Sequence, residues 1–199
     1  MVAYHVIFGA YGFWLPNDPR GSWSDFVGSW ELFRFGHATK TDETQSVAHR
    51  DHDRYLRLAT KASLKYPAVA FDDIQTRTIG DGFADYAKRA ELAVWACAIM
   101  PDHVHLVLAR HRLKIEPLVI QLKGHATRAL IENGVHPFGD IAKPAPKCFA
   151  RGEWKVYLEP DEVHRAIRYV ENNPVKEGKP QQHWPFVAPS PFSRDAESS

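Results

Sequence analysis

The feature that most constrains the fold is a pair of strand-like runs separated by a two-residue break. Residues 92–100 form an apolar run typical of a buried strand, and residues 103–109 alternate in the manner of a second strand. Only Pro101 and Asp102 stand between them, and so short a connection joins antiparallel neighbours. The sequence therefore predicts an antiparallel hairpin near the middle of the chain.

The segments around this hairpin predict the rest of a single core. Residues 4–15 are apolar, aromatic and β-branched and predict a first strand, while residues 154–158 predict a short last strand. Apolar residues at helical spacing predict three helices, over residues 71–89, 115–133 and 160–173. Pro174 is expected to end the last of these, because proline lacks a backbone N–H. This order predicts an α+β fold, a ferredoxin-like split β-α-β core with an antiparallel sheet and an added terminal helix.

The stretch between the first strand and the first of these helices is longer than such a core requires. Its turn residues and irregularly spaced aromatics follow no regular period, apart from a short helix expected near residues 55–66. A chain of 199 residues usually forms one domain, with or without a large insertion. We therefore interpret residues 1–199 as a single domain and residues 17–70 as an insertion or elaboration within it.

Composition restricts the partners and the setting. The 25 Lys and Arg residues against 24 Asp and Glu residues leave a formal net charge of +1, so a nucleic-acid partner would have to bind a local basic patch. No apolar run reaches the length of about 18 residues that a membrane span needs, and the N-terminus lacks the pattern of a signal peptide. Cys97 and Cys148 form no CxxC pair. A reducing, cytoplasmic setting without a membrane is the simplest expectation.

Two histidines alternate on the second strand of the predicted hairpin. Alternation places His103 and His105 on the same face of the sheet, roughly 6–7 Å apart along the strand. Two imidazoles on one face of a central strand favour a bound divalent metal. The alternative is a pair of histidines with ordinary hydrogen bonds at a sheet edge, and the His-x-His spacing alone does not exclude it.

The last predicted helix carries a second candidate set. Tyr169 and Asn173 are four positions apart, hence on one face and one turn apart. Because Pro174 follows, we expect the Asn173 side chain to lie at the helix end, free to bind a metal. Together with the two histidines it would form an open site that suits Mg²⁺ or Mn²⁺ rather than a closed structural zinc site. The alternative is an ordinary helix end, with Tyr169 in the core and Asn173 as a cap.

Taken together, the two segments resemble a known family of enzymes. The run from Met100 to Leu108, MPDHVHLVL, resembles the His-hydrophobic-His motif of HUH endonucleases. The run from Arg168 to Gly178, RYVENNPVKEG, resembles the tyrosine-helix motif of REP-associated tyrosine transposases, which are relatives of the insertion-sequence single-tyrosine transposases. The resemblance covers about residues 71–187 together with the first strand.

The resemblance implies a metal-dependent single-stranded DNA endonuclease and strand transferase. His103 and His105 match the metal-binding histidines, Asn173 matches the polar third ligand, and Tyr169 matches the nucleophile. Tyr169 would attack the scissile phosphate and remain as a 5′-phosphotyrosine, while Mg²⁺ or Mn²⁺ polarises the phosphate. The family further implies a single-stranded DNA partner, with a hairpin as the cleavage site, and a homodimer.

Basic residues near these motifs are candidate DNA contacts, since phosphate contacts supply most non-specific affinity. The candidates are Arg110, Arg112, Lys123, Arg128 and Lys176. The alternative for them is a solvated helix face or a surface tail.

Two other functions remain open from the sequence. A domesticated descendant would bind structured single-stranded DNA without cutting it. An unrelated metallohydrolase would use water as the nucleophile, and its activity would survive Tyr169→Phe. Tyr157, in the short last strand, competes with Tyr169 as a nucleophile, although a structural role is the more ordinary one for it.

Overall fold

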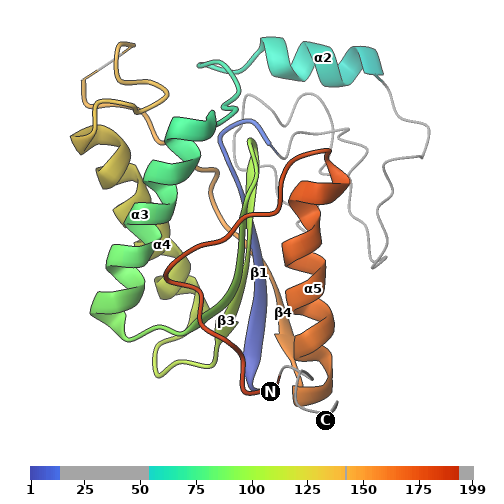
Figure 1. The fold of residues 1–199 in the computed structure, drawn as a ribbon. Helices are drawn as coiled ribbons and strands as arrows, with labels where there is room; N and C mark the ends of the chain where they lie inside the picture. The colour runs from blue at the N-terminus through green and yellow to red at the C-terminus, as the bar shows by residue number, and fades with distance from the viewer. Residues whose placement is uncertain (14–53, 142, 193–199) are drawn as a thin grey trace.

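An antiparallel sheet forms the centre of the computed structural model, which describes residues 1–13, 54–141 and 143–192 (Figure 1). In these residues the sheet has four strands in the order β2-β3-β1-β4. The strands are β1 (Ala3–Gly9), β2 (Val94–Ile99), β3 (His103–Ala109) and β4 (Trp154–Leu158). Each neighbouring pair is antiparallel, which confirms the predicted fold class.

The predicted hairpin is formed by β2 and β3. The backbone N–H of Met100 donates to the carbonyl of His103 over 2.8 Å and closes the turn at Pro101 and Asp102. The first strand is shorter than the predicted span of residues 4–15, because regular pairing with β3 ends where Gly9 meets His103. The two histidines therefore lie in the first part of β3, at the end of the sheet where β1 leaves it.

Helices cover both faces of this sheet (Figure 1). The helices in the described residues are α2 (Arg54–Ala62), α3 (Asp73–Ala90), α4 (Ile115–Glu132) and α5 (Pro160–Lys176). Helices α3 and α4 lie together on one face, over an apolar core that includes Phe8, Phe83 and Leu122. Helix α5 covers the other face, over a smaller core that includes Trp95 and Val170. None of the helices in the described residues is long and apolar enough to cross a membrane.

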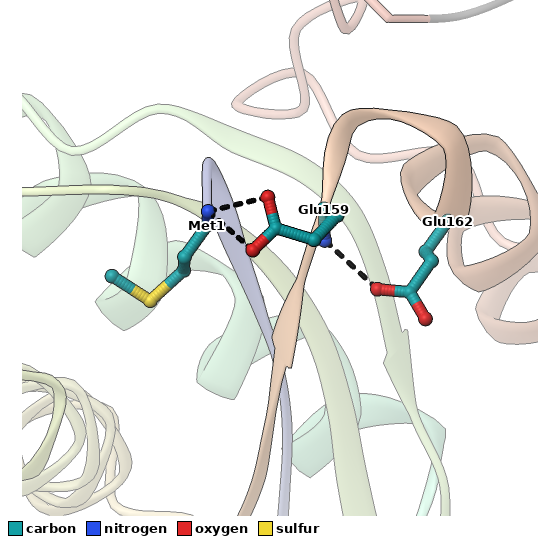
Figure 2. A network of polar contacts seen from close by, with 3 residues as sticks. All are labelled: Met1, Glu159 and Glu162. Atoms are coloured by element: carbon teal, nitrogen blue, oxygen red, sulfur yellow. Dashed lines mark hydrogen bonds and ion pairs between the residues drawn. The ribbon is translucent and has the colours of Figure 1, made fainter.

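The start of α5 is fixed to the start of β1. Both carboxylate oxygens of Glu159 contact the Met1 amino group, at 2.5 and 2.6 Å (Figure 2). The Glu162 side chain accepts a hydrogen bond from the Glu159 backbone and completes a capping box. Because β4 ends at Leu158, α5 rises from the Ala3 end of the sheet and runs antiparallel to β3.

The prediction that Pro174 ends the last helix is wrong. Helix α5 continues through Pro174 to Lys176, and the chain leaves it at Gly178, whose φ of 72° favours glycine. A proline this close to the end deprives only one carbonyl of its helical donor, and the carbonyl of Pro174 itself still accepts from the Lys179 N–H at 2.9 Å. Asn173 consequently lies inside the helix and not at its end.

The segment after α5 covers the outer edge of β2. The Gln182 side-chain amide accepts from the Ile99 N–H and donates to the Ile99 carbonyl, both at 2.8 Å. Further on, the Ala188 N–H donates to the Val94 carbonyl. Of the insertion predicted at residues 17–70, residues 17–53 lie outside the described residues, and the expected helix appears as α2, over residues 54–62.

Candidate active site between β3 and α5

The two predicted histidines lie on the face of the sheet that α5 covers. The strand register places Ile7 opposite His105 and Gly9 opposite His103. The neighbouring inward position of β1 is His5, whose Nε2 lies 3.2 Å from Nδ1 of His105. Both of these imidazoles are buried, with 8% and 4% of their surface exposed. Burial lowers the pKa of His5 to about 4 and holds that of His105 well below its ordinary value, so both rings are neutral at neutral pH.

His103 is oriented by the residue that precedes it. Its Nδ1 lies 2.7 Å from a carboxylate oxygen of Asp102, and its ring stacks on Phe13 with centroids 4.7 Å apart. The rings of His103 and His105 are 4.8 Å apart. Since Nδ1 of each ring is engaged, by Asp102 in one case and by His5 in the other, Nε2 is the nitrogen that each ring has left to bind a ligand.

Tyr169 projects from α5 onto this cluster. Its ring centroid lies 5.6 Å from that of His5 and 5.8 Å from that of His105. The side chain is 46% exposed, so a substrate can reach it, while its partial burial raises the pKa of the phenol. The ammonium of Lys176 lies 4.7 Å from the centre of the Tyr169 ring. The tyrosine, the histidines and one cation thus share one site.

Asn173 lies one turn beyond Tyr169 on the same face of α5. Because α5 and β3 run antiparallel (Figure 1), Asn173 lies nearer than Tyr169 to the level of His103, where β3 begins. Its Nδ2 is buried and has no hydrogen-bond partner in the described residues. A buried polar atom without a hydrogen-bond partner disfavours folding by about 1–3 kcal/mol. The unpaired Nδ2 of Asn173 therefore indicates a position where a further group binds. By turning about its last bond, the amide can offer its oxygen instead.

The donor set fits an open metal site. Within the described residues, no three His, Cys, Asp or Glu side chains converge on a point that could hold a metal ion. A metal bound by Nε2 of His103 and His105 would therefore need the amide of Asn173, or oxygens of the substrate, to complete its coordination. Two imidazoles and one amide leave positions for such oxygens.

Two of the other predicted residues, Tyr157 and Lys123, lie apart from this site. Tyr157 lies on the opposite face of the sheet, with its ring 5.5 Å from that of Tyr4. Lys123 donates to the carbonyls of Ala150 and Gly152, at 3.1 and 2.5 Å, and burial lowers its pKa to about 8. Its ammonium fastens a loop, so we do not retain it as a DNA contact.

The other basic candidates are exposed. Arg110 and Arg112 follow β3 at the Ala109 end, and Arg128 lies on α4, over the other face of the sheet. Lys176 alone of the five predicted contacts lies against the tyrosine. The His103 end of the sheet and the Arg110 end are roughly 20 Å apart at the rise of a β-strand.

Sequence reasoning missed His5 and the orienting role of Asp102. A single histidine in an otherwise apolar strand, two positions after Ala3 and two before Ile7, was the available signal for His5. This signal does not indicate that His5 contacts His105, because β1 and β3, which pair at Ile7 and His105, are distant in sequence. For Asp102 the signal was a carboxylate directly before the first histidine.

The chain was compared with protein families, with solved structures and with curated protein sequences. A family model described as "Transposase IS200 like" matches residues 62–173, a range that contains both histidines of β3, Tyr169 and Asn173. A candidate transposase from Deinococcus radiodurans R1 superposes with a TM-score of 0.43 at 15% identity, over 85% of this chain and 88% of that one. A REP-associated tyrosine transposase bound to a REP hairpin superposes with a TM-score of 0.45 at 12% identity, over 93% and 74%. Comparison with curated protein sequences gave no significant match.

Proposed function

The chain belongs to the IS200-like transposase family, and on this premise we propose that it cuts and rejoins single-stranded DNA with Tyr169 as the nucleophile. The observation that carries the proposal is the position of the Tyr169 ring, within 6 Å of two buried histidines and yet open to solvent. A hydrolase that activates water would not need a half-exposed phenol at this position.

The proposed reaction is a transesterification. The Tyr169 oxygen forms a bond to the scissile phosphorus, and the bond from phosphorus to the 3′ oxygen breaks. The phenolic proton leaves to solvent, and the departing oxygen takes up a proton to become a 3′-OH. The 5′ phosphate stays on Tyr169 as a phosphodiester, so a second 3′-OH can reverse the step and join strands without ATP.

We propose His103, His105 and Asn173 as the residues that hold Mg²⁺ or Mn²⁺. A bound divalent ion would supply positive charge that polarises the scissile phosphate. The protein would contribute rigid ligands, because Asp102 contacts Nδ1 of His103 and His5 contacts Nδ1 of His105. These contacts fix the orientation of the two rings. Lys176 is placed to pair with a phosphate that reaches Tyr169.

The proposed substrate is single-stranded DNA that folds into a hairpin. This extends the resemblance of the α5 sequence to the tyrosine helix of REP-associated transposases. Arg110, Arg112 and Arg128 are exposed and available to contact more distant phosphates of such a substrate. The homodimer that the resemblance implies stays a prediction, which light scattering of the purified protein would test.

The test is a covalent adduct with labelled single-stranded hairpins, drawn from DNA that flanks the gene, in the presence of Mn²⁺. We expect a protein–DNA band on a denaturing gel from the wild type and from the control Tyr157→Phe, but none from Tyr169→Phe. Cleavage that persists in Tyr169→Phe without an adduct would establish a metallohydrolase. Tight binding with no cleavage by any variant would indicate a DNA-binding protein that has lost the reaction.

A further inference from the structure

We propose that His5 is a positioning residue for His105, and that its Nε2 accepts a hydrogen bond from the Nδ1–H of His105. This role rests on the metal site proposed above, because its consequence is to direct the Nε2 lone pair of His105 toward that site. Nothing in the sequence motif includes His5, which lies on a different strand.

The contact itself is close and buried. The two nitrogen atoms are 3.2 Å apart, within hydrogen-bond distance, and the ring planes lie within 24° of one another. His5 is held on two further sides, by the edge of Trp154 with centroids 5.4 Å apart and by Tyr169. An imidazole packed in this way can set the orientation of its neighbour rather than follow it.

The tautomer decides what the contact does. A neutral imidazole has one N–H donor and one acceptor nitrogen, so the hydrogen bond can run in only two directions. If His5 donates, His105 carries its own proton at Nε2 and cannot bind a metal there. If His5 accepts, the His105 proton is at Nδ1 and Nε2 is a free ligand. Only the second direction is compatible with the proposed site.

The neighbouring histidine has the same arrangement. Asp102 is the acceptor behind Nδ1 of His103, at 2.7 Å, just as His5 is behind Nδ1 of His105. A carboxylate accepts only, whereas a neutral histidine accepts through one nitrogen. His5 is therefore the buried, uncharged counterpart of Asp102. Such partners behind a ligand typically change metal affinity by about 10- to 100-fold.

The variants are chosen to separate the hydrogen bond from the packing. His5→Gln can place an amide oxygen where Nε2 lies and so retains the acceptor, whereas His5→Leu fills a similar space and removes it. The matched control is His136→Leu, because His136 is also 8% exposed but lies elsewhere in the fold. His103→Ala serves as the control for the metal site itself.

Two measurements are made on each folded variant. Proton–nitrogen correlation spectra of the imidazole rings, recorded without metal, report which nitrogen of His105 carries the proton, and titration calorimetry with Mn²⁺ gives the Kd. We expect the His105 proton at Nδ1 in the wild type and in His5→Gln, and a shift toward Nε2 in His5→Leu. We expect Mn²⁺ binding to weaken about 10- to 100-fold in His5→Leu, by far less in His5→Gln, and not at all in His136→Leu.

A wild-type protein with the His105 proton at Nε2 would overturn the proposal, whether or not His5→Leu folds. So would a folded His5→Leu protein that binds Mn²⁺ as tightly as the wild type does, while His103→Ala binds weakly. If the wild type bound no Mn²⁺, or if His103→Ala bound it normally, the metal site of the proposed function would fail, and the role of His5 with it.

Discussion

The ring of Tyr169 lies 5.8 Å from the ring of His105, across the contact between α5 and β3. Neither residue stands on a loop: Tyr169 is in the third turn of a capped helix, and His105 is on β3, one of the two central strands of the sheet. The proposed nucleophile and a proposed metal ligand are thus held by two regular elements that pack through Val170 and Val107. Regular elements fix such geometry more closely than loops do.

Asn173→Ala should lose function without losing stability. If the amide completes the proposed metal site, its removal should weaken Mn²⁺ binding and lower adduct formation by about tenfold or more. The same change removes a buried Nδ2 atom that has no hydrogen-bond partner, so the free energy of unfolding should not fall. Calorimetry with Mn²⁺ and urea denaturation measure the two effects. Asn172→Ala, at an exposed neighbouring position, is the control and should change neither Mn²⁺ binding nor the free energy of unfolding. A clear loss of stability in Asn173→Ala would mean that the amide has a structural partner.

Lys176→Ala should impair DNA cleavage more than folding. Its ammonium lies against the Tyr169 ring, and loss of a charged contact to a phosphate costs about 1.5–3 kcal/mol, or roughly 10- to 100-fold in kcat/KM. The dependence of hairpin affinity on salt should also become less steep, by somewhat less than one unit of log Kd per log salt. Lys179→Ala removes an exposed charge just beyond the helix and is the matched control. Equal effects from both lysines would show that only net charge matters.

The sequence predicted the elements of the fold well where the pattern is local. Period-two alternation located β3 and placed both of its histidines on one face, and the capping and spacing signals located α3 and α5 to within a few residues. The position of Pro174 misled the prediction of the end of α5, because proline is costly inside a helix but removes little in the last turn.

The parts of the site that were not predicted depend on long-range pairing. His5 meets His105 only because β1 lies beside β3 in a particular register, and nothing near His5 in the sequence encodes that register. Lys123 was assigned to DNA on charge alone, whereas its ammonium is taken up by carbonyls of a loop that follows α4. Local periodicity shows which face a residue occupies, but not which residue it meets.

Lys123 should make the free energy of unfolding depend on pH in the alkaline range. Burial lowers the pKa of its ammonium from 10.5 to about 8 in the folded protein, so between these values the unfolded chain holds the proton more firmly. Unfolding then takes up protons, and the free energy of unfolding that Lys123 contributes rises as pH increases from about 8 toward 10.5. Lys123→Met replaces the ammonium, which lies 4.9 Å from the centre of the Phe8 ring, with an apolar group of similar length that does not titrate. The measurement is urea denaturation at pH 7.5 and pH 10, roughly either side of the shifted pKa. The free energy of unfolding of the wild type should rise relative to that of Lys123→Met at the higher pH. An unchanged difference between the two proteins would contradict the pKa shift.

Gly82 should tolerate no side chain, because α3 and α4 meet there at backbone distance. A Cβ at Gly82 would lie 2.6 Å from the Cα and 2.8 Å from the backbone nitrogen of Ala126, and backbone atoms inside a helix cannot move aside as a flexible side chain does. Gly82→Ala should therefore destabilise the protein by about 1–3 kcal/mol, the usual range for overpacking, as measured by urea denaturation.

The same substitution at Gly124, on α4, provides the control. Nothing lies within 4 Å of a Cβ built at Gly124, and its backbone is helical. Gly124→Ala should stabilise the protein by about 0.5–1 kcal/mol, because alanine loses less backbone entropy than glycine in a helix. The two variants make one chemical change at two helix positions and should move the free energy of unfolding in opposite directions. Stabilisation by both would mean that α3 and α4 are farther apart at Gly82 than the structure places them.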